Sequence, residues 1–191
     1  MKKYNIIYAD PPWRYQQKGV EGAAEKIYPT LSLDDICKLP VESLAQKDSL
    51  LFLWTTFPML PEAFKVISAW GFRYKTLAFL WLKQNKSGRG WYFGLGFWSR
   101  GNAELCLLAT KGNPKRKSNR VHQFIIAPLQ GHSKKPDETR DKIIELAGDL
   151  PRIELFARQK TDGWDVWGNE VPCDICLSDD TGSAGGDMCV G

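Results

Sequence analysis

The chain has 191 residues, the usual length of one domain and enough to bury a sizeable core. It is 43% hydrophobic and 25% charged with a net charge of +4, which is typical of globular proteins and excludes disordered and collagen-like classes. The longest nearly unbroken apolar run, residues 50–54, is too short for a transmembrane helix, and the start lacks a secretion-signal pattern. Since five cysteines is an odd count, we expect no disulfides and a cytoplasmic location.

Apolar runs rich in β-branched and aromatic residues predict strands, and helix-capping signals predict the helices between them. Ser32 with Asp35 forms a capping box, and Pro61 and Pro136 each stand at a first-turn position. In chain order the predictions are a strand over residues 4–9, a helix over 33–38, a strand over 50–55, a helix from Pro61 to Trp70, strands over 77–82, 104–110 and 121–127, a helix from Pro136 to about Ala147, and strands over 153–156 and 165–167.

This alternation predicts an open, mostly parallel α/β sheet in a single domain, residues 1–171. Residues 172–191 carry Gly, Ser, Asp and three Cys but no Lys or Arg, and are expected to form a disordered tail. Cys173 and Cys176 are spaced as C-x-x-C, but two further ligands are missing nearby. Free thiols are therefore expected there, and no metal site is predicted.

Basic residues concentrate between Lys83 and Arg120, where nine stand against one acid, Glu104. Because aromatic residues interleave with them, this segment favours a nucleic-acid partner, the alternative being a solvated charged face. In the long loop 83–101 we expect residues 89–92 to point outward and Trp98 inward. The candidate nucleic-acid contacts are Lys18, Arg89, Trp91, Arg100, Lys115, Arg116, Lys117 and Arg120.

The sequence Asp10-Pro11-Pro12-Trp13 directly follows the first predicted strand, where ligands bind in open α/β sheets. Two prolines remove two N–H donors, which leaves the Asp10 carboxylate and the Pro11 carbonyl as acceptors beside the flat surface of Trp13. Acceptors without donors suit a planar amine such as the N6 amino group of adenine. These four residues are the predicted catalytic set, with Trp13 stacking on the base; the alternative is a rigid turn at the end of a strand.

The tetrapeptide resembles the signature of the DPPW group of adenine N6-methyltransferases, which includes bacterial and phage DNA methylases and the catalytic subunit of the eukaryotic mRNA enzyme. The resemblance covers residues 4–170. It includes the stretches YPTLSLDDI, LFLWTT, ELCLLATKGNP, HSKKPDE, IELFAR and GWDVWGNE. It implies a Rossmann-like class I fold with permuted motif order, in which the catalytic strand comes first and the half that binds S-adenosyl-L-methionine comes last.

The resemblance also implies how that cofactor is held. Asp10 is expected near its methionine end and Lys135 at its carboxylate, since the N-terminus of a helix attracts anions. Asn169 and Glu170 are expected to bind the ribose, and Phe156 and Arg158 to lie beside the cofactor.

Three functions stay open at this point. The first is transfer of a methyl group to adenine N6 in DNA, the chemistry of a restriction-modification methylase. The second is the same transfer to RNA, and the third is a non-catalytic nucleic-acid-binding subunit. Pairing with a like subunit is possible, and neither a membrane nor a metal is expected to take part.

Overall fold

The structure is a computed structural model that describes residues 2–14, 30–96, 98–131 and 134–177. Within these ranges seven strands form one sheet in the order β5-β3-β4-β2-β1-β6-β7. The strands are β1 (Tyr4–Ala9), β2 (Ala45–Thr55), β3 (Arg73–Gln84), β4 (Ala103–Lys111), β5 (Phe124–Pro128), β6 (Arg152–Leu155) and β7 (Asp165–Trp167). The helices are α1 (Leu33–Lys38), α2 (Val41–Leu44), the 3-10 helix η1 (Phe57–Met59), α3 (Leu60–Ala69) and α4 (Glu138–Ala147).

One strand runs against the rest of the described sheet. β1 pairs in parallel with β2 and β6, β6 with β7, and β3 with β5, whereas β4 is antiparallel to both β2 and β3. The predicted mostly parallel sheet is confirmed, as is the Rossmann-like class. We call the edge where β1, β2, β3, β5, β6 and β7 end the carboxyl edge, and the opposite one the amino edge.

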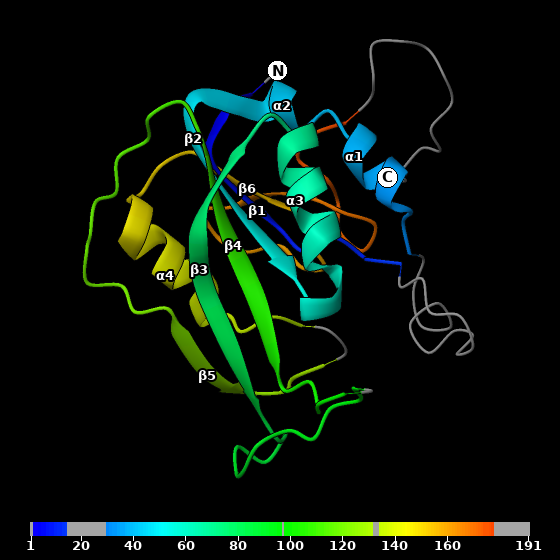
Figure 1. Cartoon of the computed structure of the whole chain (residues 1–191). Coiled ribbons are helices and arrows are strands. Elements are labelled where there is room, and N and C mark those ends of the chain that lie inside the picture. The colour runs from blue at the N-terminus through cyan, green and yellow to red at the C-terminus, as the bar shows by residue number, and fades with distance from the viewer. Residues whose placement is uncertain (1, 15–29, 97, 132–133, 178–191) are drawn as a thin grey trace.

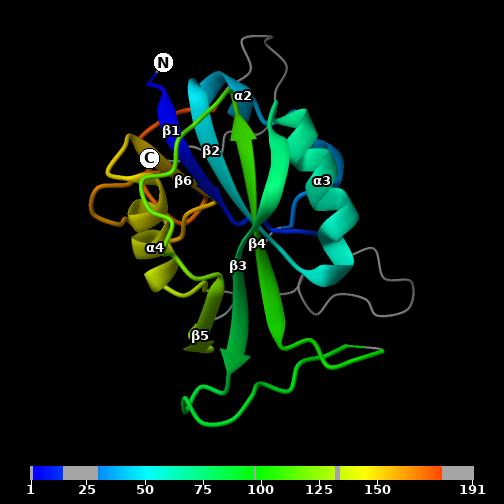
Figure 2. The ribbon, with the colours of Figure 1, turned by 60° about the vertical axis from the view of Figure 1, so that its left-hand side comes forward.

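Helices cover both faces of the sheet (Figures 1 and 2). Helices α1 and α3 lie on one face over a core that includes Ile7, Leu53 and Trp70. Helix α4 lies on the other face over a second core that includes Tyr8, Trp54 and Ile143. Each strand near the centre is therefore buried from both sides, which explains the nearly continuous apolar runs in the sequence.

Local signals begin α1 and end α3 as predicted, whereas the short helices α2 and η1 were not predicted. The Ser32 side chain accepts a hydrogen bond from the Asp35 N–H at 3.1 Å, the capping contact that starts α1. Gly71 follows α3 with a φ of 75°, a left-handed conformation that favours glycine. The observed bounds of α3 and α4 lie within two residues of the predicted ones.

Three strands start three or more residues away from their predicted first residues. β2 begins at Ala45 and not at residue 50, because α2 and a register irregularity between Tyr4 and Ile6 of β1 bring the polar residues 46–48 into its start. β3 begins at Arg73, four residues earlier than predicted, and β5 begins at Phe124, three residues later than predicted. All three errors lie at polar strand ends, where the hydrophobic pattern is weak.

The folded part extends beyond the predicted boundary at residue 171. Cys173, Ile175 and Leu177 pack against the core, and the Asp174 N–H donates to the carbonyl of Val166 in β7 at 2.9 Å. The prediction of a disordered tail from residue 172 is therefore wrong for residues 173–177, and residues 178–191 lie outside the described ranges. Among the described helices, none has the length and apolar character needed to cross a membrane.

Candidate active site

Charged side chains from distant parts of the chain meet at the carboxyl edge. Asp10 follows β1, Glu104 lies at the start of β4, and Lys135 precedes α4. Lys135 Nζ donates to Asp10 Oδ2 at 2.6 Å and lies 3.3 Å from Glu104 Oε2. Lys83, near the end of β3, pairs with Glu104. Since the Lys135 side chain is only 8% exposed, these four side chains form a largely buried network of alternating charge.

Burial and charge pairing move the pKa values of Asp10, Glu104 and Lys135 in different directions. Burial raises the pKa of Asp10 above its ordinary value, and Lys135 opposes this effect without cancelling it. Burial also acts to raise the pKa of Glu104, but the ammonium groups of Lys135 and Lys83 outweigh it and lower that pKa. Burial acts to lower the pKa of Lys135, but the two carboxylates outweigh it and raise that pKa. Of the two carboxylates that Lys135 contacts, Asp10 is therefore the one whose pKa is raised.

Trp54, near the end of β2, connects this charge network to the Asp10–Trp13 segment. Its indole N–H donates to the Tyr8 hydroxyl at 2.7 Å, and its backbone carbonyl accepts from the Trp13 indole at 3.1 Å. Its ring centroid lies 5.6 Å from Lys135 Nζ, within the range of a cation–π contact. Trp54 itself is fully buried, so it is a rigid support for both the loop and the lysine.

The segment after β1 is a tight turn. The Trp13 N–H donates to the Pro11 carbonyl at 2.9 Å, which leaves one lone pair of that oxygen as an acceptor. Trp13 is only 7% exposed and belongs to the core. The prediction that Trp13 stacks on a base is therefore wrong in this structure, because its ring faces the core. Its role is to hold the turn in place.

The predicted cofactor residues follow β6 and β7, which end side by side. Phe156 has a φ of 61°, the only left-handed non-glycine residue in the described ranges. The Ala157 N–H donates to the Trp167 carbonyl at 3.0 Å, and Phe156 packs edge-on against the Trp167 ring. Strain of this kind, of order 1–3 kcal/mol, concentrates at functional sites.

The exposed residues beyond these strand ends carry charge. Arg158 Nε lies 3.6 Å from Glu170 Oε1, and the positive charge of Arg158 acts to lower the pKa of Asp10. Asn169 is exposed between β7 and Glu170. The structure therefore places Arg158 within electrostatic range of both Asp10 and Glu170, as expected for one site.

The loop between β3 and β4 leaves from the carboxyl edge and carries Arg89, Trp91 and Arg100. Trp91 is 56% exposed, and the Arg100 guanidinium lies 4.9 Å from the centroid of the Phe93 ring. These side chains stand on the same edge as Asp10, where a nucleic acid would have to bind.

Trp98 was predicted to point inward from this loop, and that prediction is wrong, because its side chain is fully exposed. The backbone of Gly94 lies so close to Gly101 that an added Cβ would stand 1.8 Å from its carbonyl oxygen. The two arms of the loop thus lie backbone to backbone, which leaves no interior for the Trp98 ring.

The other basic candidates lie elsewhere. Lys115, Arg116 and Lys117 follow the end of β4, at the amino edge, and Arg120 is farther along the same loop. They are not brought together with Asp10. Lys18 lies outside the described residues.

The MT-A70 family model matches residues 4–170. The chain belongs to the MT-A70 family. Members of this family are class I methyltransferases that use S-adenosyl-L-methionine, so the predicted family and cofactor are confirmed.

Relatives of two kinds are similar to this MT-A70 chain. The type II methyltransferase M.MunI of a Mycoplasma species is 35% identical over 90% of this chain and 79% of its own length. The N(6)-adenosine-methyltransferase catalytic subunit METTL3 of Homo sapiens is 31% identical over 88% of this chain but 28% of its own length. The MT-A70-like N(6)-adenosine-methyltransferase of Arabidopsis thaliana is also 31% identical, over 24% of its length. The chain therefore spans most of M.MunI but about a quarter of these eukaryotic relatives.

The residues at the carboxyl edge of this MT-A70 chain fit the chemistry of the cofactor. S-adenosyl-L-methionine carries a carboxylate, an ammonium, a sulfonium and two ribose hydroxyls. When the cofactor is bound, Lys135 would provide a cation for the carboxylate, Asp10 an anion for the positive groups, and Glu170 an acceptor for the hydroxyls. Within the described ranges, no group of three His, Cys, Asp or Glu side chains is placed to hold a metal ion.

Sequence reasoning missed the supports of this site: Lys83, Glu104, Trp54 and Tyr8. One signal was available for Glu104, which is the single acid in the basic segment 83–120 and lies in a strand predicted to be buried. A buried carboxylate requires a cationic partner, and that requirement leads to Lys83 and Lys135.

Proposed function

We propose that this chain is a site-specific enzyme that transfers a methyl group from S-adenosyl-L-methionine to the N6 amino group of adenine in DNA. The observation that carries the proposal is the Asp10 carboxylate after the end of β1, bound to Lys135 and directly before the turn from Pro11 to Trp13. The similarity to a type II methyltransferase over most of that protein's length favours DNA as the substrate. A cognate restriction enzyme and pairing with a like subunit belong to the same proposal.

The residues around Asp10 act on the amine and need no covalent bond to it. The Asp10 carboxylate and the free lone pair of the Pro11 carbonyl accept the two N–H groups of adenine N6. This favours a pyramidal nitrogen, whose lone pair is less delocalised into the ring, and stabilises the positive charge that grows on nitrogen as it attacks. Trp13, Trp54 and the prolines hold both acceptors rigidly, which supplies the alignment that such a transfer requires.

When bound, S-adenosyl-L-methionine would supply an electrophilic methyl group, and its sulfur would keep the electron pair of the broken S–C bond. One proton of the amine would pass to the Asp10 carboxylate or to water. Lys135 is proposed to orient its carboxylate, Asn169 and Glu170 its ribose, and Arg158 and Phe156 to border it. Since Lys135 also binds Asp10 and Glu104, one ammonium group links the proposed cofactor site to the proposed amine site.

Methyl transfer from labelled S-adenosyl-L-methionine to duplex DNA, single-stranded DNA and RNA, followed by nucleoside analysis, tests the proposal. N6-methyladenine in DNA is the expected product. A duplex-to-single-strand ratio near one would show that the enzyme extrudes the base itself, at a cost of a few kcal/mol. Label in RNA alone would replace DNA with RNA as the substrate. Bound cofactor without transfer to any of the three would favour a non-catalytic subunit.

The pH dependence of transfer should report the ionisation of Asp10. Burial raises the pKa of Asp10. Lowering the pH is therefore expected to reduce kcat at a pH above the range in which aspartate ordinarily titrates. Lys135 acts to lower that pKa, so Lys135→Met is expected to move the acid limb to still higher pH. The pH profile of kcat at saturating cofactor and DNA measures this shift. The neighbouring exposed Lys134 provides the control, since Lys134→Met should leave the limb in place. An unchanged limb in Lys135→Met would contradict the assignment.

A further inference from the structure

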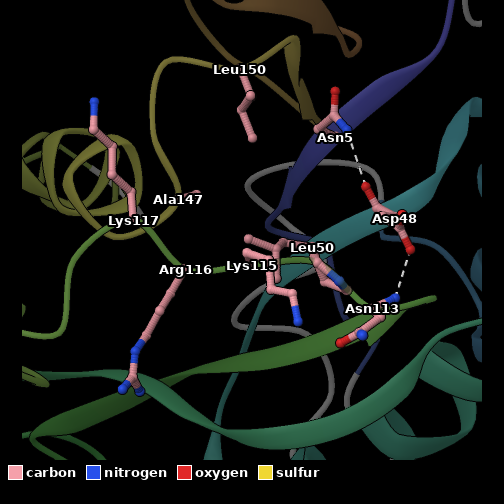
Figure 3. Close-up of a pocket in the computed structure, with 10 residues that line it drawn as sticks. Asn5, Asp48, Leu50, Asn113, Lys115, Arg116, Lys117, Ala147 and Leu150 are labelled. Carbon is pink, nitrogen blue, oxygen red and sulfur yellow. Dashed lines mark hydrogen bonds between the residues drawn. The ribbon is translucent and has the colours of Figure 1, made fainter.

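An open cavity of about 420 Å³ lies at the amino edge (Figure 3). Leu50 and Leu150 contribute apolar groups to its lining, and Asn5 and Asn113 contribute polar groups. The loop that follows β4 crosses it, with Lys115, Arg116 and Lys117 on the wall. The cavity therefore combines a concave shape with a concentration of positive charge.

The carboxylate on the wall is already engaged. Asp48 Oδ1 accepts the Asn113 N–H at 2.7 Å, and the Asp48 backbone carbonyl accepts from the Asn5 side chain at 3.1 Å. In the part of the chain that the structure describes, neither Lys115 nor Arg116 pairs with a carboxylate. Lys111, only four residues before Lys115, does pair, with Glu42 at 2.9 Å.

Lys117 has a structural explanation that the other two cations lack. Its backbone N–H donates to the Leu146 carbonyl at 2.8 Å, and its side chain passes close to Gly148 at the end of α4, where a positive charge is favourable. Figure 3 shows its side chain pointing away from those of Lys115 and Arg116. Lys115 and Arg116 are thus the exposed cations without a role in the fold.

The same loop joins the two edges of the sheet. It leaves β4 at the amino edge and runs along α4 to β5, whose end lies at the carboxyl edge (Figure 2). Arg120 is exposed along this path. Exposed cations therefore lie at the start of this loop and along it. Further cations lie on the β3–β4 loop, at the edge that the β4–β5 loop reaches.

We propose that Lys115 and Arg116 bind a backbone phosphate of the DNA substrate several base pairs away from the target adenine. The inference rests on the proposed function. β1 has six residues, so the cavity and Asp10 are about 20 Å apart at about 3.3 Å per residue. With about 3.4 Å between phosphates along a strand, this distance corresponds to about six base pairs. The contact carries no sequence information, but it makes efficient binding depend on the length of the duplex.

The test compares two hairpin duplexes with the same central target, one with about four and one with about fifteen base pairs on each side. The variant is Lys115→Gln/Arg116→Gln. The matched control is Lys38→Gln/Lys65→Gln, which removes the same charge from exposed positions on α1 and α3, on the other face of the sheet. We expect the first variant to raise the KM for the long duplex about tenfold and to flatten its salt dependence by about one phosphate contact. The KM for the short duplex and kcat are expected to stay unchanged. The control is expected to change neither KM by more than about twofold.

A KM that rises equally on both duplexes, or equally in the control, would overturn the inference, as would no change on the long duplex. Absence of methylation of any DNA by the wild type would be a failure of the proposed function instead. Fluorescence anisotropy would then still test the remote phosphate contact, because the variant should lose affinity for the long duplex and not for the short one.

Discussion

Replacing Asp10 with Asn is expected to reduce kcat for methyl transfer by about 10²–10³-fold, the effect of removing one preorganised electrostatic contact to a developing charge. Asn keeps the size of the side chain but replaces one acceptor oxygen with an NH₂ group. That group offers donors to an amine, which itself offers donors, so the two repel. The measurement is kcat at saturating cofactor and DNA.

The loss in Asp10→Asn should be chemical and not structural. Asp10 is 27% exposed, the core contacts of Trp13 do not involve its carboxylate, and the buried Lys135 keeps Glu104 as its partner. The melting temperature is therefore expected to fall by a few degrees at most. Asp34→Asn, on the exposed side of α1, is the control and should retain full activity. If Asp10→Asn kept a third or more of the wild-type kcat, the carboxylate would not be the group that activates the amine.

Replacing Gly168 with Ala is expected to disrupt the ends of β6 and β7 and to weaken cofactor binding at least tenfold. A Cβ on Gly168 would stand 2.3 Å from the Ala157 carbonyl oxygen and 2.7 Å from the Ala157 nitrogen. Both are backbone atoms, so the two strand ends would have to separate. The bond from the Ala157 N–H to the Trp167 carbonyl joins these ends and would be strained.

Separation of these strands would move Arg158 and Glu170, which follow them, and would cost about 1–3 kcal/mol of folding free energy, as overpacking typically does. Isothermal titration with S-adenosyl-L-methionine and denaturant unfolding measure the two effects. Gly101→Ala is the control, because no atom lies within 4 Å of a Cβ built there. Unchanged affinity in Gly168→Ala would show that the close approach of these strands does not shape the cofactor site.

The positions of the elements and of Asp10 could be predicted from the sequence because their signals are local. Residues 4–9 are apolar on nearly every position, and Pro11 and Pro12 end the strand, so Asp10 had to follow a buried strand. Ser32 with Asp35 located α1 in the same way. The arrangement of the sheet could not be predicted, since an apolar run shows that a strand is buried but not its direction or its neighbours.

The sequence by itself determined the order of strands and helices, the acceptor-rich turn after β1 and the family blocks, because each depends on residues close together in the chain. Tertiary structure decided which distant charges meet. The reversed direction of β4 brings Glu104 at its start to Lys135 and Asp10, and carries Lys115 and Arg116 beyond its end to the opposite edge. Tertiary structure also placed the Trp13 ring in the core. These outcomes depend on long-range packing of two apolar faces, which no local pattern encodes.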